Sequence, residues 1–293
     1  KSYPWLAIIP MRAVLEMRLT EDFMANPLLC GTIRSRFRHT INLAFPRRLI
    51  TVLSGNMPGM PDSIRVCDRA FYDLQALPVG MKSEKAGNRI SFAGSRGIRL
   101  FLDGAVSCPD TIPNSGGSSL PCRELLKITE AFLPCSGFSR LTPFFRQRIC
   151  RGLGDFCRAL VRGSAKEALI ACCGTGCGLT PSSDDALVGI MAVCRAGLLT
   201  GASLPDSHGL WDRLSGRTTD ISRKYLCCAS EGRFSQPLIA LFDKVSNEPL
   251  EQRVRAVAAV GSTSGRDTLV GIALALRTGQ ENDDRRRMDD DRF

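Results

Sequence analysis

The sequence holds few of the residue types on which several common kinds of site depend. Among 293 residues there are only two histidines, His39 and His208, so a zinc site built from cysteine and histidine has few ligands to draw on. Three tyrosines and two tryptophans leave little aromatic surface for base stacking, and no DNA- or RNA-binding motif is present. We therefore expect no metal ion and no nucleic-acid partner.

Long apolar runs are also lacking. No stretch reaches the roughly 18 uninterrupted apolar residues that a membrane helix needs, so we expect no membrane partner. Residues 1–9 begin with a charge followed by apolar residues, as a signal peptide does, but Arg12, Glu16 and Arg18 follow at once and no small-residue cleavage site is present. These features predict a cytoplasmic protein.

Cysteine, in contrast, is abundant. The thirteen cysteines are scattered and none forms a C-x-x-C pair, which is typical of the buried, reduced thiols of a cytosolic protein. We expect no cofactor. The net charge of +10 is explained equally well by an anionic small-molecule substrate and by an acidic partner subunit.

The first part of the chain has the pattern of short strands. Ile41, Leu43 and Phe45 alternate with less apolar residues, and residues 98–102 alternate again before the turn pair at 103–104. We predict a small β-rich domain over residues 30–108, preceded by an N-terminal extension over residues 1–29.

The second part has helical periodicity. Residues 109–121, rich in proline, glycine and serine, predict a linker. Beyond it, apolar residues recur at helical spacing, which predicts a larger, mainly α-helical domain over residues 122–280. Residues 281–293 are almost wholly charged and are expected to be disordered. The predicted fold class is α+β.

The most informative feature is an internal repeat with an offset of 82 residues. The segment 179–190 aligns with 261–272, so that Ser182 matches Ser264, Asp185 matches Asp267, and Gly189 matches Gly271. A serine followed three residues later by a carboxylate resembles a capping box at a helix start. A glycine inside a helix costs about 0.5 to 1 kcal/mol relative to alanine. We therefore predict that the two helices pack together at these glycines, which brings both helix starts to one place.

Three glycines at alternate positions, Gly174, Gly176 and Gly178, precede the first copy. Such a run can aim several amide groups into one concavity, and beside a helix N-terminus it suits a phosphate or carboxylate. It is neither a Walker loop nor a dinucleotide fingerprint. The alternatives are purely structural: the serines and aspartates could be only helix caps, and the glycines could only form a tight turn. The number of polar groups in one turn favours a binding site.

The candidate catalytic residues are Asp184, Asp185 and Asp267, which could orient an attacking amide nitrogen or bind a cation. Cys177 is the one thiol that could act as a nucleophile, although it lacks a histidine partner and filling a loop position explains it better. The candidate substrate-binding residues are Gly174, Gly176, Gly178, Thr180, Ser182, Ser183, Thr218, Ser222, Ser264 and Gly265.

The segment 174–185 resembles the Gly-x-Gly-x-Gly-Leu-Thr-Pro-Ser-Gly-Asp-Asp hallmark of the AllH family, and 261–267 resembles the later Gly-His-Thr-Ser-Gly-x-Asp block of that family. Segments 218–222, 229–237, 35–43 and 51–58 are also similar, so the likeness covers about residues 30 to 280. This chain departs from the pattern at Ser183, where the family usually has glycine, and at Ser262, where it usually has histidine. Without that histidine one acid, base or phosphate donor is missing.

The resemblance implies a subunit of a carbamoyltransferase that works with carbamoyl phosphate and oxamate or a related amide acceptor, in a complex with two other protein subunits. The family also includes YahE-like paralogues with no assigned reaction. Carbamoyl transfer passes through a tetrahedral oxyanion, which paired helix N-termini could stabilise. The alternative is a non-catalytic subunit that binds an anion or acts as a scaffold.

Overall fold

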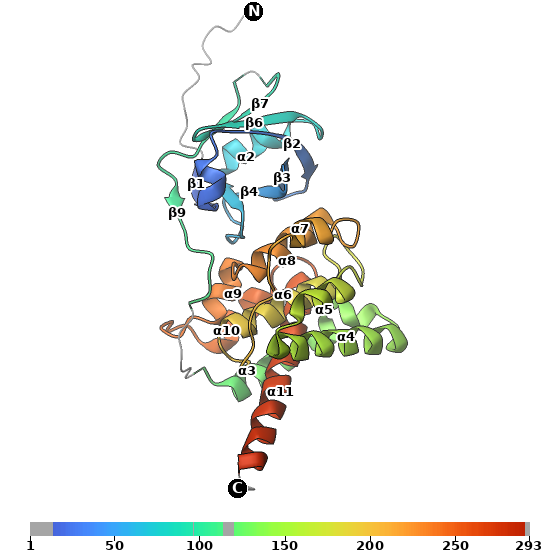
Figure 1. Cartoon of the computed structure of the whole chain (residues 1–293). Helices are drawn as coiled ribbons and strands as arrows, with labels where there is room; N and C mark the ends of the chain where they lie inside the picture. Colours follow the sequence, from blue (N-terminus) through green and yellow to red (C-terminus); the bar gives the residue numbers. More distant parts are fainter. Residues whose placement is uncertain (1–13, 96, 114–119, 291–293) are drawn as a thin grey trace, which may run out of the picture. The chain divides into compact units, whose positions relative to one another are not determined.

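The computed structural model describes residues 14–95, 97–113 and 120–290, and for residues 282–290 it describes the backbone alone. The chain divides into two compact units, one ending at Asp110 and one starting at Thr111 (Figure 1). The first is a β-sheet with short helices and the second is helical, so the predicted α+β class is confirmed. In the described ranges, every helix is too short or too polar to cross a membrane.

The first unit is built on one nine-stranded sheet with the strand order β8-β7-β6-β2-β3-β4-β5-β1-β9. Neighbouring strands are antiparallel except for β4 with β5 and β1 with β9. The elements are β1 (Val14–Arg18), α1 (Glu21–Ala25), β2 (Leu28–Arg36), β3 (Thr40–Phe45), β4 (Arg48–Leu53), β5 (Ser63–Val66), α2 (Asp68–Gln75), β6 (Lys82–Ala86), β7 (Arg89–Phe92), β8 (Arg99–Phe101) and β9 (Val106–Ser107).

Strand β1 lies in the segment for which the sequence predicted an extension outside the β domain. It pairs with β5 and β9 inside the sheet. Its pattern is unusual because Glu16 and Arg18 are buried, with Arg18 Nη2 3.0 Å from Glu16 Oε1 and with Arg65 also paired to Glu16. Charges on the buried face hide the apolar alternation, which explains why the sequence pattern missed this strand.

The second unit packs its helices around α6 and α11, which share the most extensive contact between any two elements (Figure 1). Helix α6 is buried along almost its whole length, from Ser182 to Cys194. The elements are α3 (Cys122–Glu130), the 3-10 turns η1 (Leu133–Cys135) and η2 (Gly137–Arg140), α4 (Pro143–Arg162), α5 (Ala165–Cys172), α6 (Ser182–Arg195), α7 (Leu210–Arg213), α8 (Asp220–Ser230), α9 (Gln236–Leu241), α10 (Leu250–Ala258) and α11 (Ser264–Asp290).

The end of the chain differs from the sequence analysis. Residues 281–293 were expected to be disordered, but α11 continues through Asp290; the last three residues lie outside the described part, as do residues 114–119 of the expected linker. The helix is already formed over its packed turns, and each further residue extends it without a new nucleation cost. The charged composition alone therefore did not predict the end of the helix.

The contact between α6 and α11 depends on two glycines. A Cβ atom built on Gly189 would lie 2.1 Å from the carbonyl oxygen of Thr268, and one built on Gly271 would lie 1.9 Å from the carbonyl oxygen of Ala186. Both distances are far below van der Waals contact, and the obstructing atoms belong to rigid helix backbone. The prediction that the two helices pack at these glycines is confirmed.

Replacing either glycine by alanine should force the helices apart. We expect Gly189→Ala and Gly271→Ala each to lower the free energy of unfolding by about 1 to 3 kcal/mol, as overpacked cores do. Gly154→Ala in α4 is the matched control, because its Cβ would come no closer than 3.6 Å to the mobile end of Arg158. Urea unfolding of the three variants measures the difference, and equal stability of all three would contradict this account.

Candidate functional site

The glycine run folds back over the start of α6. The amide of Ser183 donates to the Thr175 carbonyl (3.0 Å), and the amide of Thr175 donates to the Ser183 hydroxyl (2.9 Å). Gly174 and Gly176 have φ values of 78° and 126°, and a Cβ on either would collide with backbone, at the Arg217 carbonyl and the Ser182 amide respectively. Glycine is therefore required at both positions.

This loop replaces the cap that the sequence predicted. The N-cap of α6 is Pro181, which makes no side-chain cap bond, and Ser182 is the first helical residue. The interpretation of Ser182 as a capping serine is therefore wrong. The reason is that the carbonyl of Thr175 already accepts a first-turn amide of the helix.

Asp184 is held by groups from three segments. Its Oδ1 accepts from the Gly174 amide (2.6 Å) and the Ser183 hydroxyl (3.2 Å), and its Oδ2 accepts from the Thr218 hydroxyl. The side chain is 1% exposed. Burial raises the pKa of Asp184, and these hydrogen bonds oppose the increase.

Asp185 joins the two copies of the repeat. The Thr180 hydroxyl donates to Asp185 Oδ2 (2.9 Å) and lies 2.7 Å from the Ser264 hydroxyl at the start of α11. Because Thr180 has one proton to donate, Ser264 donates to Thr180 when Thr180 donates to Asp185. Burial raises the pKa of Asp185 to about 8, and the nearby charge of Asp267 adds to the increase.

Asp267 is fully buried one turn inside α11. Its Oδ1 accepts from the amide of Gly137 in η2 (2.6 Å). Its Oδ2 lies beside the Ser182 hydroxyl, close to where a side chain on Gly137 would stand, and makes no well-formed hydrogen bond among the described residues. Burial raises the pKa of Asp267 as well.

A third helix start reaches the same place. Thr219 caps α8 by accepting from the Ser222 amide (3.1 Å), and its hydroxyl donates to the Leu179 carbonyl (2.5 Å). Thr218 binds Asp184, and Ser222 lies beside it. The starts of α6, α8 and α11 thus surround Asp184, Asp185 and Asp267, which we call the buried carboxylate cluster.

Most of the predicted site residues lie around this cluster, but two do not. Gly178 is exposed and faces open space, with nothing nearer to a built Cβ than 3.7 Å. Gly265 packs against α10, where a Cβ would lie 1.9 Å from the Val257 carbonyl oxygen. Cys177 is exposed in the loop. The predicted site residues that lie in or around the buried carboxylate cluster are Gly174, Gly176, Thr180, Ser182, Ser183, Asp184, Asp185, Thr218, Ser222, Ser264 and Asp267.

Sequence reasoning missed two members of the site. Gly137 supplies the amide that binds Asp267 across 130 residues of sequence. Burial raises the pKa of the Tyr225 phenol, and the nearby charges of Cys228 and, to a smaller degree, Asp185 add to the increase. Neither belongs to the repeat; the only signal was that Tyr225 stands one turn after the Thr218–Ser222 segment.

The cluster suits proton transfer and hydrogen bonding. With a pKa near 8, Asp185 is mostly a neutral carboxylic acid at pH 7, and such a group can donate a hydrogen bond or a proton. Within the described ranges, no group of three or more His, Cys, Asp and Glu side chains is arranged to hold a metal ion. The groups that the cluster presents are the carboxyl groups of Asp184, Asp185 and Asp267 and the hydroxyl and amide groups bonded to them.

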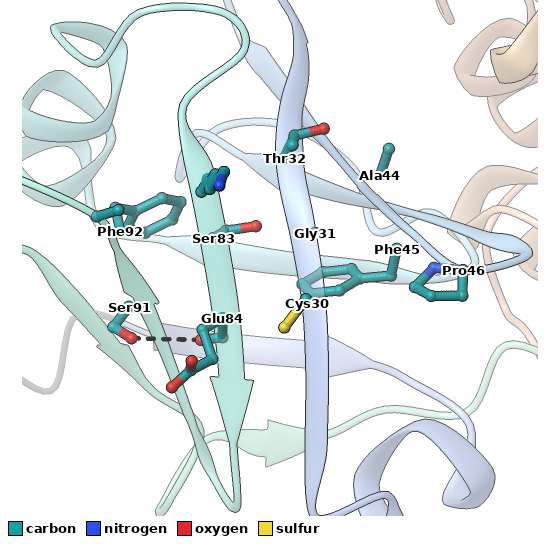
Figure 2. A pocket seen from close by; sticks show the side chains of 12 residues that line it. Cys30, Gly31, Thr32, Ala44, Phe45, Pro46, Ser83, Glu84, Ser91 and Phe92 are labelled. Atoms are coloured by element: carbon teal, nitrogen blue, oxygen red, sulfur yellow. Dashed lines mark hydrogen bonds between the residues drawn. The ribbon is translucent and has the colours of Figure 1, made fainter.

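The sheet carries a separate pocket of about 680 Å³ (Figure 2). Cross-strand pairs place Cys30 beside Glu84 and Thr32 beside Lys82 in its wall, and the Ser91 hydroxyl donates to the Glu84 carbonyl (3.4 Å). The charged side chains that line the pocket are Lys82 and Glu84, and none of the predicted site residues is among the lining residues. It is lined by Cys30, Gly31, Thr32, Ala44, Phe45, Pro46, Lys82, Ser83, Glu84, Ser91, Phe92 and Ala93.

Comparison with protein families matches both parts of the chain. Residues 172–276, which include both copies of the repeat, match the family described as oxamate carbamoyltransferase subunit AllH. Residues 12–107 match the AllH family N-terminal domain. No solved structure matches the chain.

The raised pKa of Asp185 has a consequence for stability. Its folded-state pKa of about 8 lies above the ordinary value of 3.8, so the folded chain holds the proton more tightly than the unfolded chain. The stabilisation that the Asp185 proton gives to the folded chain is complete below pH 4. It is lost as the pH rises towards 8 and beyond, and the free energy of unfolding falls by at most about 1.4 kcal/mol per pH unit. We expect Asp185→Asn to make the decline shallower.

Urea unfolding between pH 4.5 and 8.5 measures this effect. Asp155→Asn is the control, because the Asp155 side chain is 62% exposed on the surface of α4; that variant should follow the unmodified chain. Parallel pH profiles for Asp185→Asn and the unmodified chain would show that Asp185 titrates no differently after folding.

Proposed function

This chain belongs to the AllH family, and on that premise we propose that it is a subunit of an oxamate carbamoyltransferase. In this proposal it works with two other protein subunits and contributes a small-molecule site at the convergent starts of α6, α8 and α11. The supporting observation is that the two copies of the repeat, 82 residues apart, meet at the bond between Thr180 and Ser264.

The reaction joins oxamate to the carbamoyl group of carbamoyl phosphate. The oxamate nitrogen attacks the carbamoyl carbon, a C–N bond forms, the bond from carbon to the phosphate oxygen breaks, and the nitrogen loses a proton. Negative charge develops on the carbamoyl oxygen before phosphate leaves. A site for this reaction needs an anion-binding surface for the phosphate, a group that steadies the oxyanion, and an acceptor for the proton.

The glycine loop is the proposed phosphate-binding surface. Gly176, Cys177 and Gly178 are exposed, and no hydrogen bond from their amides to another described residue occupies them. Consecutive amides of this kind bind anions. The buried carboxylate cluster is unsuited to phosphate, because its own carboxylates already use the amides of Gly174 and Gly137.

Asp185 is the proposed acid in the reaction. In its neutral form it can donate a hydrogen bond to the developing oxyanion, and once ionised it can take the proton from nitrogen. Asp184 and Asp267 would orient the amide group of the acceptor. The chain of hydroxyls from Ser264 through Thr180 links Asp185 to less buried positions and offers the proton a route.

A second candidate function is a non-catalytic subunit that binds an anion or acts as a scaffold. The observation that favours it is the burial of the cluster, whose carboxylates are all less than 10% exposed and are largely satisfied by the protein's own groups. Under this alternative the same residues hold three helix starts together and take no part in turnover.

Substitution in the complete complex separates the two candidates. We expect Asp185→Asn, assembled with the partner subunits, to lower the rate of carbamoyl transfer by about 100-fold or more, as loss of an acid–base group does, while the subunits still assemble. Asp155→Asn should retain full activity. Unchanged turnover with Asp185→Asn would rule out the catalytic role and leave the scaffold.

A further inference from the structure

Helix α4 begins with two aromatic side chains turned towards solvent. Phe144 is 71% exposed and Phe145 is 50% exposed, and their rings form an edge-to-face pair with centroids 5.8 Å apart. The face of the helix that packs into the core is a different one, formed by Ile149, Leu153 and Phe156. The two phenylalanines therefore play no part in the core of the described structure.

The same helix start is strongly basic. No aspartate or glutamate occurs from residue 131 to 154, whereas four arginines do. Arg148 and Arg151 are exposed and stand four and seven positions after Phe144, so they continue its side of the helix. Phe144, Phe145, Arg148 and Arg151 together form what we call the aromatic–basic stripe.

This arrangement is unfavourable for the chain by itself. The N-terminal end of a helix carries partial positive charge, so acidic residues are preferred in its first turn and a basic residue there, such as Arg146, is disfavoured. Helix α4 has no acidic residue in its first turn, whereas α6 has two aspartates there. Exposed phenylalanines add a further cost, which contact with another surface would remove.

The stripe is also rigidly supported. Arg146 donates to the carbonyl groups of Phe138 (3.0 Å), Ser139 (3.3 Å) and Leu141 (3.2 Å), which ties the start of α4 to η2. A surface that is held in place before binding loses little conformational freedom when a partner docks. Figure 1 shows α4 alongside α5 at the outside of the helical unit.

We propose that the aromatic–basic stripe is the surface by which this chain docks onto a partner subunit of the transferase. The partner would offer an apolar recess for Phe144 and Phe145, rimmed by carboxylates that face Arg148 and Arg151. Aromatic residues and arginine are the types most enriched at the energetic centres of protein interfaces. The inference rests on the proposed function only in requiring that partner subunits exist.

The test is a calorimetric titration of the purified chain with the partner subunits of an oxamate carbamoyltransferase. We expect the double variant Phe144→Ser, Phe145→Ser to weaken binding at least 10-fold, and Arg148→Glu, Arg151→Glu to weaken it and reverse its salt dependence. Val245→Ser is the matched control, because Val245 is 87% exposed elsewhere on the helical unit; it should bind like the unmodified chain.

Several outcomes would overturn the docking proposal: equal affinity for all variants, no binding by the unmodified chain, or loss of binding that follows loss of folding in circular dichroism. The proposal would also be overturned if substitutions in the stripe left binding to the partner subunits unchanged and altered only self-association, binding to acidic vesicles or binding to random duplex DNA. Weakened docking in a complex that never shows carbamoyl transfer would support the stripe and refute the proposed function. Full turnover by a complex in which the stripe variants dock like the unmodified chain would support the proposed function and refute the docking proposal.

Discussion

The arrangement of the helical unit depends on the close backbone contact between α6 and α11. Gly189 and Gly271 let each helix approach a carbonyl group of the other, where any side chain would collide. Once this contact is made, Thr180 and Ser264 come within hydrogen-bond distance. The position of every group in the carboxylate cluster follows from that approach, because each is attached to one of these helices or to a segment bonded to them.

Burial is what gives the cluster its chemical character. Exposed aspartates at helix starts would be ionised and would simply favour the helix dipole. Here the surroundings exclude water, and the pKa of all three carboxyl groups is raised. The protein keeps them in place with amide and hydroxyl donors from distant segments. Burying carboxyl groups in this way lowers stability at neutral pH, but it yields a carboxylic acid that still carries its proton there.

The sequence revealed the parts of this arrangement that are local. The Ser-x-x-Asp turns and the helix glycines lie within a few residues of one another, so their pairing could be inferred from the repeat. Gly137 could not be found, because it lies 130 residues before Asp267 in the sequence and outside the repeat. Strand β1 was missed for another reason: Glu16 is paired with Arg18 and Arg65 in the sheet, and hydrophobic periodicity does not record a buried ion pair. The cap at Pro181 was hidden because backbone of the glycine loop serves in place of a side chain.

The two glycine contacts are related to each other in a specific way. Gly189 meets Thr268, and Gly271 meets Ala186; shifting each residue by the repeat offset converts one contact into the other. This is the reciprocity of an isologous interface, in which one patch pairs with its own copy about a two-fold axis. In a homodimer any substitution would appear on both sides at once. With both copies in one chain, their surroundings can differ: the glycine loop precedes only the first helix, and the Gly137 amide binds only Asp267 of the second. The pseudo-symmetry therefore covers the glycine contacts of α6 and α11 but not the groups that bind the carboxylates at their starts.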